Sequence, residues 1–421
     1  MNAIQHASVV IIGGGQAGVQ FADSLRTAVK VPITIVTDEI HHPYQRPPLS
    51  KSLWKSDVRT SAIPLRNEDF FRSRGIRLLA GVRATAIDRD AKRVTLDDGE
   101  SIPYSVLVLA TGARPRTIPL EGSHLPGVHQ LRTIDDGVLL QDSLRGAKEL
   151  VVLGGGFIGL EVAASAAERG MTTTVLEMQA NVLQRALTPV TSRWLTEFHI
   201  RSGVDIRLQT SAEAILASDG RASAVVTGTG ERIPADLIVL GVGAVPNSEL
   251  AAEAGLTVND GIIVDANLQT DDPAIWAIGD SVRFPSHFTG ATARLESVQN
   301  ATDQARVLAK NVAASLGHGE QQYYAAVPWF WSNQGPVRLQ IAGIGNTAVA
   351  ETVVRRYGED KLSVFAFEDG RLTVVESINA AADHIAARRI IASGGKLDKT
   401  LAEDPTVPLA SAVAPQAAAA R

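Results

Sequence analysis

Many apolar residues of this chain gather in short, uninterrupted runs that are followed by glycine within three residues. Four of these runs span residues 9–12, 106–109, 150–153 and 237–240. Runs of this length without polar alternation are typical of strands buried on both faces, as in parallel sheets covered by helices. Longer segments rich in alanine and leucine follow two of the runs and indicate helices. The pattern therefore predicts an α/β fold built on parallel sheets.

The first run leads directly into a GxGxxG motif made by Gly13, Gly15 and Gly18. In such a motif the first glycine makes a tight turn, the second lets the backbone approach a pyrophosphate, and the third allows close packing of helix on strand. The free N–H groups and the dipole at the start of the next helix favour the anion. The motif predicts a dinucleotide site.

The same arrangement returns in the middle of the chain, where Gly154, Gly156 and Gly159 follow the run at 150–153. One such motif is weak evidence, but two copies with a strand before and a helix after are strong evidence. Each copy also has an acidic residue after its next strand, where a ribose-binding carboxylate belongs. These residues are Asp38, with Glu39 as an alternative, in the first copy and Glu177 in the second.

A further repeat shows that whole domains are duplicated. Residues 94–113 and 226–244 each read as a small β-element followed by an apolar strand that stops at glycine. The strand at 275–280 follows the second copy but is typical of sheet material of the first. We therefore expect a discontinuous first nucleotide-binding domain (1–112 and 248–320), a second inserted into it (113–247), a C-terminal α+β domain (321–407) and an alanine-rich mobile tail (408–421).

The amino-acid composition excludes several classes of function. The chain has 421 residues, 45% of them hydrophobic, with a net charge of −5, which argues against a general nucleic-acid or anionic-membrane binder. It contains no cysteine, which excludes disulfides, thiol redox centres and cysteine-ligated metals. No apolar run is long enough to span a membrane, and no secretory signal is visible, so a cytoplasmic protein is expected. His41, His42 and His199 are interpreted as surface or core histidines, and no metal site is expected.

Several stretches give the chain a family resemblance. They are residues 13–18, 44–51 (with RPPLSK at 46–51), 110–112, 131–133, 154–161, 275–280, 294–300 and 328–332 (PWFWS). With these stretches the chain resembles the FAD-dependent, NADH-using ferredoxin reductases of bacterial oxygenase systems, of the putidaredoxin reductase and rhodocoxin reductase type. The resemblance covers nearly the whole chain. It implies a glutathione-reductase-like flavoprotein with two dinucleotide-binding domains and a C-terminal α+β domain.

The resemblance also assigns the sites. The first domain would hold FAD, the inserted domain NADH, and the C-terminal domain would close over the flavin. Implied FAD contacts are Gly13, Gly15, Gln16, Ala17, Gly18, Asp38, Arg46, Lys51, Ala84, Ala110, Thr111, Gly112, Arg132, Gly279, Asp280, Glu296, Ser297, Val298 and Trp331. Implied NADH contacts are Gly154, Gly156, Phe157, Ile158, Gly159, Glu161, Glu177 and Gly243.

Lys51 and Glu161 are the catalytic pair that the resemblance implies. A fixed ammonium beside the isoalloxazine would stabilise negative charge on the reduced flavin, and Glu161 would hold that ammonium. Hydride would pass from NADH to FAD, and single electrons would then pass to an iron–sulfur ferredoxin that supplies a haem-thiolate or ring-hydroxylating oxygenase. Trp331 would lie between flavin and acceptor. Arg306 and Arg338 could form a basic patch that steers an acidic ferredoxin.

Other proteins of the same fold have different functions, and these are alternatives for this chain. Disulfide reductases and NADH peroxidases need a redox cysteine near residues 44–51, and this chain has none. An NADH oxidase with oxygen as acceptor stays open, as does a non-enzymatic NADH-responsive interaction protein. In addition, Asn333 and Gly335 depart from the family pattern after PWFW, as does Ala410 near the C-terminus. These departures leave the identity of the ferredoxin open, and either a monomer or a homodimer is compatible with the sequence.

Overall fold

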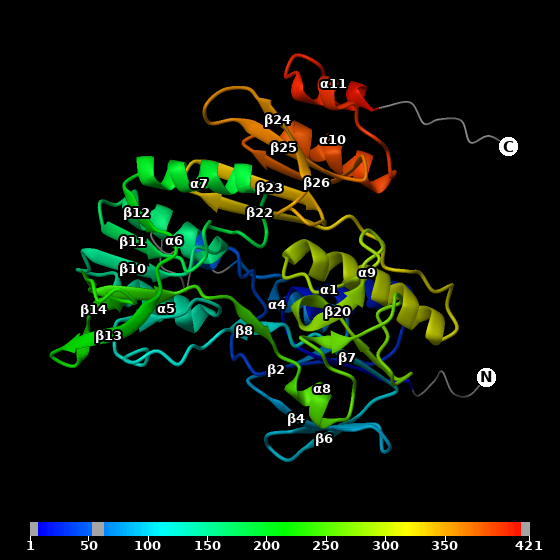
Figure 1. The fold of residues 1–421 in the computed structure, drawn as a ribbon. Coiled ribbons are helices and arrows are strands. Elements are labelled where there is room, and N and C mark those ends of the chain that lie inside the picture. Colours follow the sequence, from blue (N-terminus) through cyan, green and yellow to red (C-terminus); the bar gives the residue numbers. More distant parts are fainter. Residues whose placement is uncertain (1–6, 53–62, 414–421) are drawn as a thin grey trace. The chain divides into compact units, whose positions relative to one another are not determined.

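The computed structural model describes residues 7–52 and 63–413, and its contacts divide the chain into two units (Figure 1). Of the described residues, the first unit holds 7–45, 63–114 and 244–326. The second holds 46–52, 115–243 and 327–413. Both units are therefore discontinuous in sequence.

The first unit is built on a five-stranded parallel sheet in the order β19-β7-β1-β2-β3. Its strands are β1 (Val9–Ile12), β2 (Ile33–Thr37), β3 (Ile76–Ala80), β7 (Val106–Leu109) and β19 (Ile275–Ala277). The central strands β1 and β7 are buried along their whole length, which explains their lack of polar positions. β19 completes the sheet from a segment that follows the whole second nucleotide-binding fold in sequence, as the sequence analysis expected.

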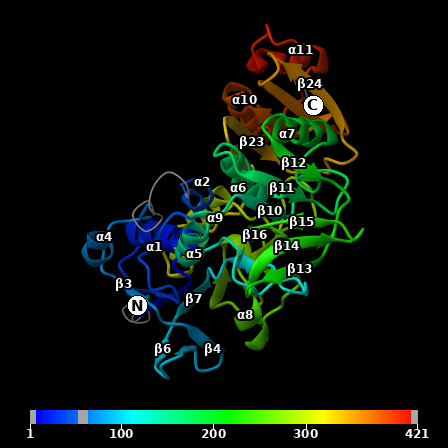
Figure 2. The same ribbon diagram turned by 90° about the vertical axis from the view of Figure 1, so that its left-hand side faces the viewer.

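Two helices of the first unit, α1 (Gln16–Ala28) and α9 (Val298–Ser315), lie side by side (Figures 1 and 2). Smaller elements complete the unit. They are α4 (Glu68–Ser73), β4 (Ala84–Asp88), β5 (Arg93–Leu96), β6 (Ser101–Pro103), β8 (Ala113–Pro115), β17 (Ala244–Pro246), α8 (Glu249–Glu253), β18 (Ile262–Ile263), the 3-10 turn η2 (Gly279–Ser281), β20 (Val282–Pro285) and β21 (Thr292–Ala293).

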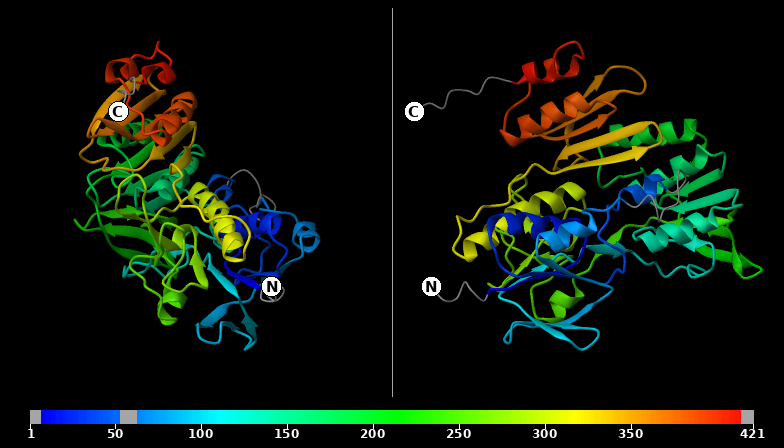
Figure 3. Two further views of the ribbon diagram at one scale, coloured as in Figure 1. Left: turned by 90° about the vertical axis from the view of Figure 1, so that its right-hand side faces the viewer. Right: turned by 180° about the vertical axis from the view of Figure 1, so that it is seen from behind.

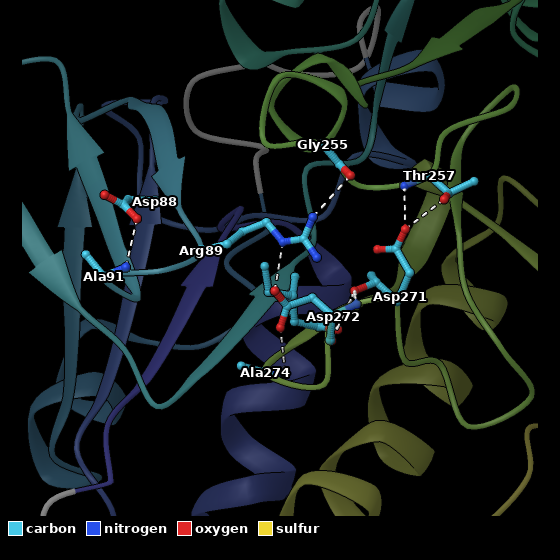
Figure 4. A network of polar contacts seen from close by, with 10 residues as sticks. Asp88, Arg89, Ala91, Gly255, Thr257, Asp271, Asp272 and Ala274 are labelled. Carbon is cyan, nitrogen blue, oxygen red and sulfur yellow. Dashed lines mark hydrogen bonds and ion pairs between the residues drawn. The ribbon is translucent and has the colours of Figure 1, made fainter.

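An arginine fastens the β4–β5–β6 sheet to the rest of the first unit (Figure 4). Arg89, just after β4, donates from Nε to the Asp272 carboxylate at 2.8 Å and from its guanidinium to the carbonyl of Gly255 at 3.1 Å. The neighbouring Asp271 accepts from the backbone N–H and the hydroxyl of Thr257. Arg89 is thus bound to two segments that lie more than 160 residues later in the sequence.

The second unit repeats the parallel architecture, with strand order β12-β11-β10-β16-β9. Its strands are β9 (Val128–His129), β10 (Glu149–Leu153), β11 (Thr172–Leu176), β12 (Val204–Arg207) and β16 (Leu237–Leu240), and an antiparallel sheet is formed by β13 (Ala212–Ser218), β14 (Arg221–Thr227) and β15 (Arg232–Pro234). Its helices are α2 (Pro48–Ser52), α5 (Ile134–Ser143), α6 (Phe157–Ala167) and α7 (Pro189–Arg201).

The duplication extends to single hydrogen bonds. Gly13 N–H donates to the carbonyl of Val36 on β2, and Gly154 N–H donates to that of Leu176 on β11, both at 2.8 Å. Each glycine therefore leaves its strand at the same register. The repeat inferred from the sequence is thus a repeat of backbone geometry.

The C-terminal part of the second unit is an antiparallel sheet in the order β22-β23-β26-β25-β24. Its strands are β22 (Trp329–Gln334), β23 (Val337–Gly343), β24 (Glu351–Arg356), β25 (Leu362–Glu368) and β26 (Arg371–Ile378). Helix α10 (Ala381–Ala392) packs on β23 and β26 and is followed by α11 (Lys399–Glu403) (Figure 3). The expected α+β element is therefore present.

The end of the described chain is held by a buried arginine. Arg355 on β24 is 1% exposed and donates to the backbone carbonyls of Ala402, Asp404 and Val407. Residues Leu409–Ala412 then form the 3-10 turn η3, in which Leu409 and Ala412 are buried. Residues 408–413 therefore belong to the folded unit and differ from the tail expected there, because apolar burial and carbonyl hydrogen bonds outweigh their low-complexity composition. The rest of that expected tail lies outside the described residues.

None of the helices in the described part of the chain is long and apolar enough to cross a membrane. Across residues 7–52 and 63–413, no group of three or more His, Cys, Asp or Glu side chains is placed to hold a metal ion.

Candidate functional site

The first glycine turn contains two locked positions and one open position. A Cβ on Gly13 would lie 2.1 Å from the carbonyl oxygen of Ala110, and one on Gly18 would lie 2.1 Å from that of Gly13. Gly13 also has a φ of +117°. A Cβ on Gly15, in contrast, would meet nothing within 4 Å. The space above Gly15 borders the N-terminus of α1 and fits the pyrophosphate of a dinucleotide.

Polar contacts gather further residues of the predicted FAD site at the same edge of the sheet. Gln16 donates to the Thr302 hydroxyl on α9 at 3.0 Å. Gly279 N–H donates to the amide oxygen of Gln304, also on α9, at 2.7 Å. A Cβ on Gly279 would lie 3.1 Å from the Cβ of Ala17. The glycine turn, the segment that carries Asp280 and the start of α9 are thus brought together.

The remaining residues of this edge are fixed by local caps and turns. The Ser297 side chain caps α9 by accepting from Asn300 N–H at 3.0 Å, and the helix begins at Val298. Its first N–H groups lack carbonyl partners within the helix and form an anion-binding end. Thr111 and Gly112 are bound to Asn247 through its backbone and side chain, in bonds of 2.6 to 2.9 Å.

Two predicted FAD residues of the first unit have cationic partners that the sequence did not indicate. Asp38 forms an exposed ion pair with Arg83 at 3.1 Å, next to the predicted contact Ala84. Glu296 pairs with Arg294. The alternative ribose ligand, Glu39, accepts the hydroxyl of Tyr44 at 2.5 Å.

The second glycine turn repeats the division of the first. A Cβ on Gly154 would lie 2.5 Å from the carbonyl oxygen of Gly241, and one on Gly159 would lie 2.4 Å from that of Gly154. At Gly156 the nearest atom would be 3.6 Å away, an ordinary contact distance. Here too the middle glycine is free to face a ligand. Gly243 lies between β16 and β17 with a φ of +104°, so a side chain would be strained there.

Glu177 is bound to this turn. One of its carboxylate oxygens accepts Gly155 N–H and the other accepts Gln179 N–H, both at 2.7 Å. Each carboxylate oxygen has two lone pairs, so capacity for ribose hydroxyls remains. The predicted contacts Phe157 and Ile158 follow on α6: the Phe157 ring packs on Phe330 at 4.4 Å, and Ile158 is 41% exposed.

Lys51 and Glu161 form an ion pair inside the second unit. The Lys51 ammonium lies 3.0 Å from both carboxylate oxygens of Glu161, with the side chains 23% and 5% exposed respectively. Helix α2 begins at Pro48, which suits a first helical position, and it packs against α5 and α6. Nearby, Arg46 donates to the carbonyl of Arg132 at 2.7 Å. Four predicted residues from three segments, Arg46 and Lys51 with Arg132 and Glu161, are thus held in one unit.

Three donors that the sequence did not indicate share the Glu161 carboxylate with Lys51. Ser332 donates to Oε1 at 2.7 Å, Asn333 N–H donates to Oε1 at 3.2 Å, and Ser50 donates to Oε2. Ser332 and Asn333 lie on β22, some 170 residues from Glu161 in sequence. No local signal links them to the pair.

His199 is wholly buried on α7, as a core histidine, and continues these contacts. Its Nε2 lies 2.7 Å from the amide oxygen of Gln334, whose Nε2 lies 3.2 Å from the Ser332 hydroxyl. Burial lowers the pKa of His199.

The residues expected near the acceptor are distributed over both units. On β22, half-buried Trp331 contacts Trp329, with ring centres 5.5 Å apart, and the Arg388 guanidinium lies 4.8 Å from the Trp329 ring. Arg338 is exposed on β23 of the same unit. Arg306 lies on α9 of the first unit, 58% exposed and 3.6 Å from Asp303. The basic patch expected from Arg306 and Arg338 stays a prediction.

Two family models of known proteins match this chain. Residues 7–305 match the family model of the pyridine nucleotide-disulphide oxidoreductases, and residues 329–413 match that of the reductase C-terminal domain. The chain belongs to the pyridine nucleotide-disulphide oxidoreductases. The predicted family and fold class are confirmed. This member contains no cysteine. It therefore has the two nucleotide-binding folds of the family but no redox-active disulphide.

Relatives within this oxidoreductase family resemble the chain over nearly its full length. It is 46% identical to "Rhodocoxin reductase" of Rhodococcus erythropolis, covering 97% of this chain and 94% of the relative. It is 38% identical to the "Anthranilate 1,2-dioxygenase system ferredoxin--NAD(+) reductase component" of Burkholderia cepacia, covering 95% and 98%. A solved structure, the "Ferredoxin Reductase for the CYP199A2 System from Rhodopseudomonas palustris", superposes with a TM-score of 0.93 at 41% identity, covering 97% and 100%.

Proposed function

We propose that this chain is an FAD-dependent NADH:ferredoxin reductase of an oxygenase system. It takes hydride from NADH and delivers single electrons to an iron–sulfur ferredoxin. Support comes from its family, from relatives named as reductases of rhodocoxin and ferredoxin, and from its two complete nucleotide-binding folds.

The observation that carries the proposal is the pair of open glycines. Gly15 and Gly156 have room for a ligand, whereas a Cβ on the first or third glycine of either motif would collide with a backbone carbonyl oxygen. Two such turns in one chain provide for two dinucleotides at once. A two-cofactor hydride transfer needs one tightly held and one exchangeable dinucleotide.

FAD is assigned to the first unit. When bound, it would supply the conversion of a two-electron hydride transfer into two single-electron transfers. The chain provides the residues that would hold it: the N-terminus of α1 would bind the pyrophosphate, and Asp38 would accept hydrogen bonds from ribose hydroxyls. The N-terminus of α9 provides N–H groups and a positive dipole end for negative charge on the ring system.

NADH is assigned to the second glycine turn, and Glu177 selects it over NADPH. Its carboxylate is held by Gly155 N–H and Gln179 N–H, so it cannot easily swing away from the ribose. A 2′-phosphate would meet this negative charge, and such like-charge contacts cost several kcal/mol. The next basic residue along the chain, Arg185, is eight positions further on.

Lys51 and Glu161 form the catalytic pair of the proposal. With the cofactors bound, the ammonium would supply positive charge to the reacting rings, and Glu161 holds the ammonium through two 3.0 Å contacts. Each hydride brings two electrons and one proton; the two electrons would pass to two ferredoxin molecules and the proton to water, so no dedicated general base is required.

The test uses the purified FAD-loaded protein. NADH oxidation is followed with each iron–sulfur ferredoxin encoded next to this gene, with oxygen alone, and with NADPH in place of NADH. Fast ferredoxin reduction that prefers NADH by at least tenfold supports the proposal. Hydrogen peroxide formed from oxygen at the same rate would instead assign an NADH oxidase. Slow flavin reduction with NADH-induced dimerisation would assign an interaction protein.

A further inference from the structure

A buried row of side chains runs from the core of the second unit to the Lys51–Glu161 pair. It starts at His199 on α7, continues through Gln334 and Ser332 on β22, and ends at the Glu161 carboxylate on α6. The first three residues have exposures of 0% and Glu161 has 4%. Each link is between 2.7 and 3.2 Å long.

The hydrogen bonds of this row all point the same way. The amide of Gln334 donates from its nitrogen to Ser332, so its oxygen accepts, and His199 Nε2–H must be the donor. Burial lowers the pKa of His199, which favours the neutral ring with one N–H. The Ser332 hydroxyl, having accepted from Gln334, donates its own hydrogen to Glu161 Oε1. A hydroxyl bound in this way has no freedom to turn to another acceptor.

The row fixes the carboxylate against rotation. Terminal torsions of Glu side chains are broad, so a carboxylate is held only by what binds its oxygens. Oε1 of Glu161 is bound from β22 by Ser332 and by Asn333 N–H, and Oε2 is bound by Ser50. Lys51 spans both oxygens at 3.0 Å. Since the lysine stem is flexible, the direction of this carboxylate decides where the ammonium lies.

We propose that Ser332 and Gln334 are positioning residues for hydride transfer. They orient the Glu161 carboxylate and, through it, the Lys51 ammonium. The strand that begins the C-terminal sheet thereby sets the geometry of the catalytic pair. The inference rests on the proposed function, in which that pair acts on the transfer of hydride from NADH.

The experiment compares rapid-mixing flavin reduction by NADH in the full-length FAD-loaded protein and its variants. Ser332→Ala removes the hydroxyl, Gln334→Met removes the amide at similar volume, and Ser332→Thr restores a hydroxyl. The matched control is Ser363→Ala on β25, because Ser363 is also wholly buried and also donates to a carboxylate, that of Asp383, at 2.8 Å.

Two quantities are measured for each variant: the limiting reduction rate at saturating NADH and the apparent dissociation constant of NADH. We expect Ser332→Ala to lower the limiting rate about tenfold and Gln334→Met about threefold, with the dissociation constant within a factor of two, because misorientation affects the reaction more than binding. Ser332→Thr should recover most of the rate, and Ser363→Ala should match wild type. In a Glu161→Gln background, Ser332→Ala should slow the reaction no further.

Other outcomes would overturn either the positioning role of Ser332 and Gln334 or the catalytic role of Lys51 and Glu161. Wild-type rates in Ser332→Ala and Gln334→Met, with a slow Glu161→Gln, would overturn the positioning role and leave the catalytic pair standing. A wild-type rate in Glu161→Gln would overturn both. Equal slowing by Ser363→Ala would show that any buried hydroxyl in this sheet matters equally, and would also overturn the inference. If Ser332→Ala fails to retain FAD, Gln334→Met, which keeps the hydroxyl, decides the question.

Discussion

Replacing each of two glycines of the first turn by alanine should have opposite consequences. In Gly13→Ala the new methyl group would lie 2.1 Å from a carbonyl oxygen, at a φ of +117°. An unfavourable φ costs about 1–3 kcal/mol and forced overpacking about 1–3 kcal/mol, so roughly 2–6 kcal/mol of unfolding free energy should be lost. This variant should fold poorly whether or not FAD is present.

Gly15→Ala should leave the apoprotein intact. The backbone at Gly15 has φ −79° and ψ −168°, which alanine adopts easily, and the methyl group would meet no protein atom within 4 Å. Alanine stabilises the fold by about 0.4–1 kcal/mol because it lowers the conformational entropy of the unfolded chain, and about 0.5–1 kcal/mol is lost because glycine is the better N-cap. The net change in unfolding free energy should be within about 0.5 kcal/mol.

FAD binding by Gly15→Ala should nevertheless be weakened. The methyl group would occupy the space assigned to the pyrophosphate, and the loss of one charge-assisted hydrogen bond costs about 1.5–3 kcal/mol. That corresponds to a dissociation constant raised by roughly 10- to 150-fold. The same logic makes Gly156→Ala a variant that folds normally and binds NADH weakly.

Denaturant unfolding of the apoproteins gives the first quantity, and flavin fluorescence titration gives the second. The reasoning is refuted if Gly15→Ala binds FAD as wild type does, since the open space would then not be the phosphate site. It is equally refuted if apo Gly15→Ala is destabilised as much as apo Gly13→Ala.

Three further predictions concern the second unit and the acceptor. Lys51→Met should slow flavin reduction by NADH in rapid mixing about tenfold or more while FAD stays bound, because it removes the positive charge that Glu161 holds; an unchanged rate would make the pair structural. Trp331→Ala should slow ferredoxin reduction and spare NADH-to-ferricyanide turnover, while Arg306→Glu should raise the Michaelis constant for ferredoxin and flatten its salt dependence; wild-type behaviour of both across ionic strengths would place the acceptor elsewhere. Glu376 is wholly buried, binds the N–H and hydroxyl of Thr188, and has a pKa raised by burial. Its contribution to stability is therefore greatest below the ordinary carboxyl pKa and declines as pH rises through the raised value. Wild type should accordingly lose unfolding free energy relative to Glu376→Gln between pH 4 and 8, and a difference that is constant with pH would contradict this.

The parts of the molecule that sequence predicted best are those in which one short segment determines its own geometry. The glycine turns at Gly13 and Gly154 follow from a strand, a missing side chain and a helix start, all within about ten residues of one another. The duplication made each turn evidence for the other. The discontinuous first unit was predictable because residues 275–280 read as a buried strand with no sheet of their own nearby in the sequence.

The contacts around Glu161 were not predictable from the residues alone. Lys51 and Glu161 were linked by family resemblance, since their spacing of 110 residues carries no helical or strand period. Ser332 belongs to the PWFWS stretch of the family resemblance, but nothing in the sequence linked Ser332 or His199 to Glu161, because a single serine on a strand and a single histidine on a helix are ordinary core residues. Only the packing of α6, α7 and β22 determines that they meet. Similarly, Arg83 as the partner of Asp38 depends on where β4 begins relative to β2.

The hydrogen bonds from Arg355 to the end of the chain determine which sequence changes that segment can tolerate. The guanidinium donates hydrogen bonds to the main-chain oxygens of residues 402, 404 and 407. Every amino acid, proline included, has such an oxygen. Exposed side chains between these points are therefore free to vary in an evolving or engineered lineage. Inserting or deleting one residue there would shift the oxygens away from a buried positive charge. In this segment the identity of the exposed side chains can change, but the number of residues between the bound carbonyls cannot.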